Sequence, residues 1–590
     1  LAESYSTMVN GVSKQKKRSL YHIGPLHRYD DGDPNYLERL RQSFRQGNPL
    51  IAELEPYVQM NRNTVSIEFD RSSEEQTTAD IKNIGYFLVD ALFDALGISS
   101  VLTLHKSRKK IPYDLVGLTK LLVIGRTLSP ASKISTYENK DNYLMPVTES
   151  TDWHEIYKCL DELDKKSEAI QKRMNQKLTG PTGKRGEITY YDVTNYFFEI
   201  EQNDADAFDE HGVLIKKGLR KKGVCKNNRK TPIVQMGMFL DEHGIPVSYH
   251  LFPGNTLDQA TLRPAMKKTI DQYNLKKIII VADRGLTSNK NLAHIKDQAH
   301  GYVFSKSIKK CAKLERTWVL DQEGYSSNKE GSFKVKSKIV TKKIKDENGK
   351  EVEVKEKVIC YWSKKFYMRE LKENESFLAT LQKYIDQPSS IKSEKGKLKK
   401  FIDETAVDGE TGEILNPRTL RSINMAKAQE FNDLMGYYMI VTSEIDRPDE
   451  EIIDTYRGLT RIEDSFRIIK SDLKARPIYV SLEEHINAHF LVCFIALVMM
   501  RLIQNKIVEA TGASTKSAFD WEAGLSAMRI QTALKEYSAI EIPQGYFLTT
   551  KATEDLKTIT RALGIEKDLR IPTLSELKQY RFDIRKKLIT

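Results

Sequence analysis

Four segments in the middle of the chain have the composition of strands in one sheet, and they constrain the fold more than any other feature. EITYYDVTNYFFEI, PIVQMGMFLD and IPVSYHLF follow one another within residues 187–252, and KKIIIVAD (276–283) is short and apolar. A strand of that last kind is buried on both faces, so helices must cover both sides of its sheet. A helix is expected from Asp258, between the third and fourth strands. The pattern predicts an α/β fold.

The segments around this sheet carry mainly helical periodicity. Apolar residues recur at helical spacing through most of residues 80–178 and again from Asp449 to Leu473. Two hairpins are predicted, one turning at Asn10-Gly11 and a long basic one turning at Asn348-Gly349. We divide the chain into six regions: 1–75 (hairpin and helix), 76–182 (helical), 183–306 (first part of the α/β core), 307–434 (β-rich insertion), 435–505 (second part of the core) and 506–590 (C-terminal helical region).

Composition excludes several classes of protein. Of 590 residues, 40% are hydrophobic and 29% charged, which is typical of a soluble globular protein rather than a disordered, fibrous or membrane-embedded one. The longest apolar run, Phe490 to Met500, is too short to span a bilayer. Five cysteines without a C-x-x-C pair argue against a disulfide framework or zinc ribbon. We expect a cytoplasmic protein without a secretory signal, whose natural N-terminus precedes Leu1.

The net charge of +12 is concentrated in two stretches. Residues 211–230 contain eight Lys or Arg and no Asp or Glu, and residues 301–370 contain 18 basic and 10 acidic side chains. KQKKR at 14–18 is a smaller basic run. Each is typical either of a solvated loop or hairpin edge or of a surface that contacts a polyanion backbone, and both interpretations stay open for each.

Three acids lie where strand ends and a helix would present them to one point. Asp192 is in the first strand, Asp283 ends KKIIIVAD, and Glu463 is on the helix after the apolar strand at 436–443. Carboxylates are the ligands that hard divalent cations prefer. Two such ions can activate an attacking oxygen and stabilise the leaving one in phosphoryl transfer. Taken singly, each acid is weak evidence for a metal site, since most Asp residues at strand ends only cap the strand or are solvated.

The helix around Glu463 has two distinct faces. Tyr456, Glu463 and Lys470 fall on one arc, which also holds Thr460 and Arg467. Leu459, Ile462, Phe466, Ile469 and Leu473 form an adjacent apolar stripe that can pack on a sheet. Such a helix fits a metal site beside phosphates, or equally an amphipathic surface helix with charge pairs. The histidines of HINAH (485–489) lack the Glu of a zinc helix and are expected to support the core.

These segments resemble the DDE transposases of bacterial insertion sequences, the branch with a Tyr-(2)-Arg-(3)-Glu-(6)-Lys signature. YRGLTRIEDSFRIIK places Tyr456, Glu463 and Lys470 at three of the four signature positions, while YYDVTNYFF and IIIVADRG are similar to the segments with the first two acids. The resemblance covers about 185–300 and 436–505, and more weakly the first 50 residues. It departs at Leu459, where the signature has Arg. Arg457 and Arg461 are the neighbouring cations, on other faces of the helix.

The resemblance implies a ribonuclease-H-like catalytic core, formed by 183–306 and 435–505 and interrupted by the β-rich insertion. It also implies a cut-and-paste transposase in which Asp192, Asp283 and Glu463 are catalytic and hold two Mg²⁺ or Mn²⁺ ions. Its partners would be terminal inverted repeats, bound partly by residues 1–75, and target DNA. The protein would act as a homodimer in a synaptic complex at the bacterial nucleoid. The DNA-contacting residues would be Tyr456, Lys470, Arg467, Arg284, Lys226, Arg229, Lys221 and Lys222.

Two other functions stay open. A related metal-dependent nuclease would cleave DNA without joining it, and a non-catalytic DNA-binding protein could keep the fold. Members of the resembled branch also cut the second strand through a DNA hairpin and hold a flipped base on an aromatic residue. Trp318, Trp362 and Tyr361 in the insertion are candidates for that residue, although packing alone would explain them.

Overall fold

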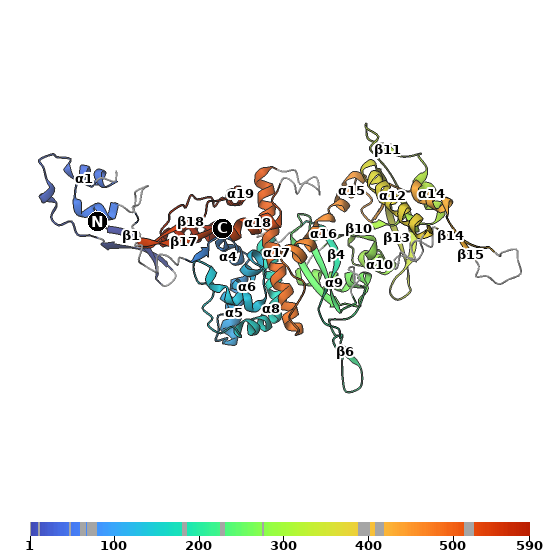
Figure 1. Ribbon diagram of the computed structural model, residues 1–590, viewed down its shortest axis with the longest axis horizontal. Helices are drawn as coiled ribbons and strands as arrows, with labels where there is room; N and C mark the ends of the chain where they lie inside the picture. The colour runs from blue at the N-terminus through green and yellow to red at the C-terminus, as the bar shows by residue number, and fades with distance from the viewer. Residues whose placement is uncertain are drawn as a thin grey trace. The chain divides into compact units, whose positions relative to one another are not determined.

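The chain divides into two compact units in the computed structural model (Figure 1). One comprises Leu1–Ala79 with Glu541–Tyr546, and the other comprises Asp80–Ile540 with Phe547–Thr590. The structure describes residues 2–9, 12–19, 21–45, 49–58, 67, 80–179, 186–224, 230–273, 277–386, 402–407, 418–512 and 524–589.

The smaller unit begins with the predicted hairpin. Strand β1 (Ala2–Val9) pairs antiparallel with β2 (Val12–Ser19), and Val9 lies opposite Val12 at the closed end. Its expected turn residues, Asn10 and Gly11, lie outside the described residues. Helices α1 (Tyr36–Arg45) and α2 (Glu55–Val58) follow.

A nine-stranded mixed sheet forms the centre of the larger unit, in the order β11-β12-β13-β16-β10-β9-β4-β7-β8. β4 runs antiparallel to β7, and β7 to β8, whereas β4, β9 and β10 are parallel. All four predicted strands are present. The bounds are β4 (Ile188–Phe197), β7 (Ile233–Asp241), β8 (Pro246–Pro253), β9 (Ile279–Ala282), β10 (Gly301–Lys306), β11 (Ser326–Ser327), β12 (Phe333–Lys345), β13 (Glu351–Ser363) and β16 (Tyr437–Thr442).

The two faces of this sheet belong to different cores. Ile280 and Ala282 pack with residues of α9 (Asp258–Tyr273) and α10 (Asn289–Asp297). Tyr190 and Val281 face the other way and join the larger core with α15 (Asp449–Arg457), α16 (Thr460–Arg467) and α17 (Glu483–Thr511). Because side chains alternate along a strand, Asp192 lies on the Tyr190 face.

The long basic hairpin continues the central sheet. Strand β13 pairs antiparallel with β16 from Lys357↔Thr442 to Trp362↔Tyr437. The apolar residues of β13, such as Ile359, are buried at this junction, whereas the basic residues of β12 lie nearer the sheet edge. Helices also belong to the predicted β-rich region, whose further elements are α11 (Lys313–Leu320), α12 (Lys364–Asp386), β14 (Ile402–Val407), β15 (Arg418–Ile423) and α14 (Met425–Asp433).

Helices pack around α17 on the side away from β4 and β10 (Figure 1). Helix α17 is long and apolar enough to cross a membrane by length and composition, but 89% of its most apolar window is buried inside the protein. It contacts α6, α8 and β8, which explains its apolar surface on every side. The helices of this region are α4 (Tyr86–Ala95), α5 (Ile98–Lys109), α6 (Leu115–Leu128), α7 (Lys133–Glu138) and α8 (Glu155–Thr179).

The C-terminal region is not wholly helical, contrary to the sequence-based expectation. Strand β17 (Ser538–Ile542) pairs with β3 (Ile81–Asn83), and β18 (Tyr546–Thr549) completes a small sheet. These strands are short, so their alternation is too brief to give a clear signal. The helices are α18 (Ala527–Glu536), α19 (Glu554–Ala562) and α20 (Leu574–Ile589).

Candidate functional site

The first two predicted acids lie on neighbouring parallel strands: Asp192 is in the middle of β4, and Asp283 directly follows the last residue of β9. Tyr190 of β4 is opposite Val281 of β9. Continuing that register by two residues places Asp192 beside Asp283. Across β9, Phe304 of β10 is opposite Ala282, and the next residue, Ser305, donates a hydrogen bond from Oγ to Asp283 Oδ1 at 2.8 Å. Polar side chains of three adjacent strands therefore lie side by side on one face of the sheet.

The helix expected from Asp449 to Leu473 consists of three pieces. Helix α15 ends at Arg457, α16 covers Thr460–Arg467, and a π-helical turn, η10, covers Ile468–Asp472. The apolar stripe is buried as predicted, with Leu459, Ile462, Phe466, Ile469 and Leu473 all at most 7% exposed. That stripe seats α16 on the sheet, on the face that carries Asp192.

Gly458 permits the close approach of α15 to the sheet. The Tyr190 hydroxyl donates to the Thr455 carbonyl at 3.1 Å, directly beneath the junction of α15 and α16. A Cβ atom at position 458 would overlap the Tyr190 hydroxyl and contact its ring. Only glycine fits there without moving the strand or the helix, so this residue helps to set the distance between β4 and the helix with Glu463.

Gly458→Ala should therefore destabilise the protein, although Gly→Ala within a helix normally stabilises it. We expect a loss of about 1–3 kcal/mol in the free energy of unfolding, as for other overpacked cores. Denaturation of the full chain followed by fluorescence would measure it. Gly285→Ala is the control, because nothing lies within 4 Å of a Cβ there. Equal stability of both variants and wild type would contradict the close-approach argument.

Tyr456 links the second and third acids. Burial raises its pKa to about 12; a hydrogen bond with Ser305 lowers it, and the charges of Asp283 and Glu463 raise it further. Both carboxylates thus act on the same phenol, which stays protonated at neutral pH. An uncharged hydroxyl beside two carboxylates can donate a hydrogen bond to a phosphate oxygen without adding to the negative charge.

Lys470 lies on the same face of the sheet as Asp192. Its ammonium group donates to the Thr194 hydroxyl, two residues beyond Asp192 on β4. It also lies 5.4 Å from the ring centroid of Tyr196 and 5.9 Å from that of Phe466. The π-helical turn thus directs this cation to the strand of the first acid, about 7 Å along it.

The three carboxylates are chemically suited to bind a divalent cation, but they are too far apart to bind one together. Three carboxylates on one face of the sheet and one helix are the oxygen ligands that Mg²⁺ and Mn²⁺ prefer. Among the described residues, however, no group of three or more His, Cys, Asp or Glu side chains is close enough to hold a metal ion. The three acids lie on one face, and Asp283 and Glu463 both lie near Tyr456. To coordinate one metal ion, the carboxylates would have to come closer together.

The remaining predicted DNA-contacting residues are distributed around this face. The Arg284 backbone N–H donates to Ser305 Oγ at 3.0 Å, and its side chain is exposed beside Asp283. Arg467 pairs with Asp464 at 2.9 Å and Asp472 at 3.3 Å. Lys221 pairs with Asp206 at 2.7 Å, and Lys222 is exposed. Lys226 and Arg229 lie outside the described residues.

At the position of the signature Arg, Leu459 is buried. The two neighbouring cations lie elsewhere, as their helix faces indicate: Arg457 pairs with Asp454 at 3.0 Å, and Arg461 donates to the Glu242 carbonyl.

The three aromatic residues of the insertion that were candidates for holding a flipped base all have packing partners. Tyr361 is buried and stacks on Tyr438, and Trp362 donates to the Met435 carbonyl at 3.2 Å. Trp318 lies under the ammonium groups of Lys336 and Lys338.

Sequence reasoning missed two side chains that position this site. Ser305 follows the apolar residues of β10, as Asp283 follows those of β9, but a single Ser is too common to stand out. Arg501 of α17 is wholly buried and its Nη2 lies 3.1 Å from Asp464 Oδ2, in the residue after Glu463. An arginine ending an apolar run was the available signal, because a fully buried arginine needs a partner.

Residues 206–499 match the protein family described as "Transposase DDE domain". The matched segment is almost half of the 590 residues and contains Asp283, Glu463 and Lys470, while Asp192 precedes it. The match supports a DNA transposase. No curated protein sequence matches the chain.

Solved structures of transposases are among those similar to this chain. A synaptic complex of piggyBac transposase with hairpin DNA aligns at a TM-score of 0.35 and 7% identity, over 80% of this chain and 75% of that one. A Mos1 mariner paired-end complex with Mn aligns at a TM-score of 0.13 and 12% identity, over 46% of this chain and 68% of that one. TM-scores this low carry no further argument.

Proposed function

We propose that the protein is a cut-and-paste DNA transposase that cleaves transposon ends and joins their 3′-OH groups to target DNA. The observation that carries the proposal is the convergence of Asp192, Asp283 and Glu463 on one face, two of them within the segment similar to transposase DDE domains. The strand order β8-β7-β4-β9-β10, antiparallel and then parallel, supports a ribonuclease-H-like core.

The three acids would hold two Mg²⁺ or Mn²⁺ ions. Bound there, such ions would activate the attacking oxygen and stabilise the leaving one during phosphoryl transfer. Ser305 holds the Asp283 carboxylate in place through its hydroxyl. Tyr456 and Lys470 would bind phosphate oxygens on either side of the acids, one with a neutral hydroxyl and one with a cation. Arg284, exposed next to Asp283, would contact the adjoining phosphate backbone of the DNA.

Terminal inverted repeats and target DNA are the proposed partners, within a homodimeric synaptic complex. The proposed DNA-binding regions are residues 1–75, which include the basic run 14–18, the basic run 211–230 and strand β12. The positive charge of 14–18, 211–230 and β12 suits the phosphate backbone of DNA. Asp192 and its two partner acids are all present, so we place a non-catalytic DNA-binding role second. The proposed cellular location is the bacterial nucleoid.

A strand-transfer assay tests this proposal and separates it from a nuclease. The substrate would be precut DNA ends taken from the sequence flanking the coding region, incubated with the full chain, a supercoiled target and Mg²⁺ or Mn²⁺. We expect joined products that disappear on chelation. Cleavage of uncut ends without any joining would identify a nuclease instead. DNA binding without either reaction would support the non-catalytic role.

A further inference from the structure

A cavity lined by cations lies beyond the acidic site, where the chain leaves η10. It has a volume of about 430 Å³, and Lys474 and Arg476 contribute to it from this segment. Arg126, Lys133 and His489 contribute from helices α6, α7 and α17. None of the 13 described residues that line it is an aspartate or glutamate. The cavity is therefore lined by cations without a carboxylate to balance them.

Two of these cations are almost fully buried. Arg126 and Lys133 are each 7% exposed. Arg126 donates from Nη1 to the carbonyls of Leu473 and Lys474 and from Nη2 to that of Ala131, each at 3.2 Å, while its Nε has no hydrogen-bond partner among the described residues. These bonds join the two walls of the cavity but leave the positive charge in place. A buried charge without a counter-charge is costly, and a bound anion would offset that cost.

Lys133 and His489 form a pair in which only the lysine can change its charge near neutral pH. His489 Nε2 lies 3.0 Å from the Ala475 carbonyl, which requires an N–H there and leaves Nδ1 to accept from Lys133 Nζ at 3.4 Å. Burial lowers the pKa of His489 well below its usual value, so the ring is neutral. Burial, and then the charge of Arg126, lower the pKa of Lys133 to about 7. The thiols of Cys159 and Cys493 also face Lys133, and burial raises the pKa of each.

Strand β4 connects the acids to this cavity through the core of the protein. Lys470 contacts Thr194, the Tyr196 ring packs against Phe490 beside His489, and Phe198 bridges Ile478 in the segment that lines the cavity. At about 3.3 Å per residue, Phe198 lies about 20 Å beyond Asp192. At the surface, the half-buried Lys470, the exposed Lys474 and the half-buried Arg476 follow one another along the chain toward the cavity, which the last two line.

We propose that the cavity lined by Arg126, Lys133 and Arg476 binds a backbone phosphate of the DNA strand that extends from the acidic site. This inference rests on the proposed function for its choice of DNA. The volume lies within the usual range for ligand cavities and exceeds what a bare phosphate needs. Recognition would be electrostatic and independent of base sequence.

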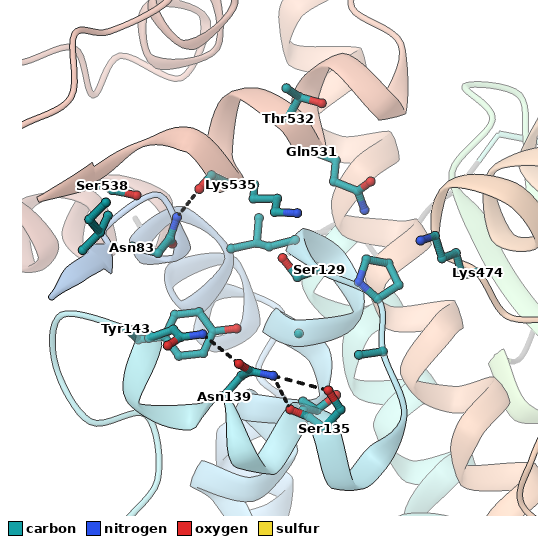
Figure 2. A pocket seen from close by; sticks show the side chains of 17 residues that line it. Asn83, Ser129, Ser135, Asn139, Tyr143, Lys474, Gln531, Thr532, Lys535 and Ser538 are labelled. Carbon is teal, nitrogen blue, oxygen red and sulfur yellow. Dashed lines mark hydrogen bonds between the residues drawn. The ribbon is translucent and has the colours of Figure 1, made fainter.

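An adjoining cavity continues the same surface. It has a volume of about 650 Å³ and shares Pro130, Ala131 and Lys474 with the first. Figure 2 shows Lys474 and Lys535 directed toward it from two different elements. Its 17 described lining residues also include no carboxylate. The strand could therefore continue past the first cavity without meeting a negative charge.

Oligonucleotide binding without metal tests this inference apart from catalysis. The full chain in EDTA would be titrated against a fluorescein-labelled 12-nucleotide oligo(dT) by fluorescence anisotropy. We expect Lys133→Met to weaken binding about tenfold, the usual effect of one charge-assisted contact, and Lys133→Arg to restore most of it. Arg476→Gln, at a half-buried position, is the second variant if Lys133→Met fails to fold. Lys109→Met removes an exposed charge from α5 and should change the affinity by less than about twofold.

The pH dependence gives a signature that a purely structural lysine would lack. Binding of a phosphodiester favours the ammonium form of Lys133, so wild-type affinity should fall as pH rises above about 7. His489 stays neutral and the two thiols stay protonated over this range. From pH 7 to 8.5 we expect a fall of up to about tenfold in the wild type and a flat profile in Lys133→Met.

Calorimetry with inorganic phosphate at constant ionic strength shows whether the ligand of the cavity is a DNA phosphate or a free phosphate ion. If Lys133→Met loses inorganic phosphate but binds the oligonucleotide like the Lys109→Met control, a free phosphate is the ligand and the DNA assignment is overturned. If neither affinity differs from that control, the cavity is not a phosphate site. If the wild type binds no DNA at all, the proposed function fails, while the phosphate titration still decides whether the cavity binds an anion.

Discussion

Replacing any one of Asp192, Asp283 and Glu463 by its amide should lower the rate of strand cleavage by about 10³-fold or more. Each amide removes a charge and an ionic oxygen ligand from the proposed metal site, where several kcal/mol of transition-state stabilisation depend on metal. DNA affinity should stay constant or rise slightly, because a negative charge near the phosphates is lost. Single-turnover cleavage of end DNA, with anisotropy on the same DNA, would measure both quantities.

Glu450→Gln is the matched control for this series. Glu450 is exposed in the first turn of α15, on the same helical segment as Tyr456, so its replacement makes the same chemical change away from the acids. Its rate should stay within about twofold of wild type. Full Mg²⁺-dependent cleavage by all three amide variants would refute the metal site.

A thiolate at position 283 gives a more specific test of metal contact. Asp283→Cys should be inactive with Mg²⁺, which prefers oxygen, and should regain part of its activity with Mn²⁺, which accepts softer ligands more readily. Asp283→Asn should show no such recovery. This difference between two metals would not arise if Asp283 only held Ser305 and the strand end.

The sequence predicted the parts of this fold that follow from local periodicity. The alternation in 187–252 and the apolar strand at 278–282 identified the strands that carry the first two acids, because a buried strand needs both composition and flanking breaks. The arc of Tyr456, Glu463 and Lys470 placed these residues on one face. What that pattern does not encode is the break at Gly458, which depends on the Tyr190 side chain from a strand about 270 residues earlier.

Long-range pairings account for the rest of what sequence reasoning did not find. The hairpin of β12 and β13 was predicted, but the pairing of β13 with β16 was not. The sequence of a strand does not indicate which distant strand it pairs with. Likewise Lys133, Arg126 and His489 are separated by up to 363 positions and form a cavity only in the folded chain. The role of Arg501 was missed for the same reason, because its partner Asp464 is 37 residues away in the sequence.

Arg501→Met should destabilise the larger unit and also slow DNA cleavage. The guanidinium is wholly buried and donates to Ser465 Oγ at 2.6 Å, the Arg461 carbonyl at 3.0 Å and Gln504 Oε1 at 3.0 Å, besides its ion pair with Asp464. Burial lowers its pKa to about 10, with Asp464 opposing the shift, so the group stays charged at neutral pH. Removing one partner of such a pair typically costs about 3–5 kcal/mol.

The effect on activity has a separate cause. Helix α16 carries Glu463 next to Asp464, and Arg501 fixes that helix from α17, so Arg501 acts as a positioning residue. Conditions in which Arg501→Met remains folded should therefore still show slow cleavage with DNA affinity close to wild type. Arg501→Lys keeps the charge but not the planar guanidinium that reaches several acceptors. Its stability and its cleavage rate should therefore lie between those of the wild type and of Arg501→Met.

A double-mutant cycle with Asp464→Asn distinguishes the ion pair from simple loss of packing. If Arg501 and Asp464 stabilise each other, the double variant should be more stable than the sum of the single effects predicts, by about 0.5–3 kcal/mol. Thermal unfolding of the full chain, with all four proteins at one concentration, would give the comparison. Strict additivity would mean that Arg501 contributes through its bulk and its bonds to Ser465, Gln504 and the Arg461 carbonyl, without the ion pair. The link from α17 to Glu463 would then pass through the neighbouring serine instead of the carboxylate.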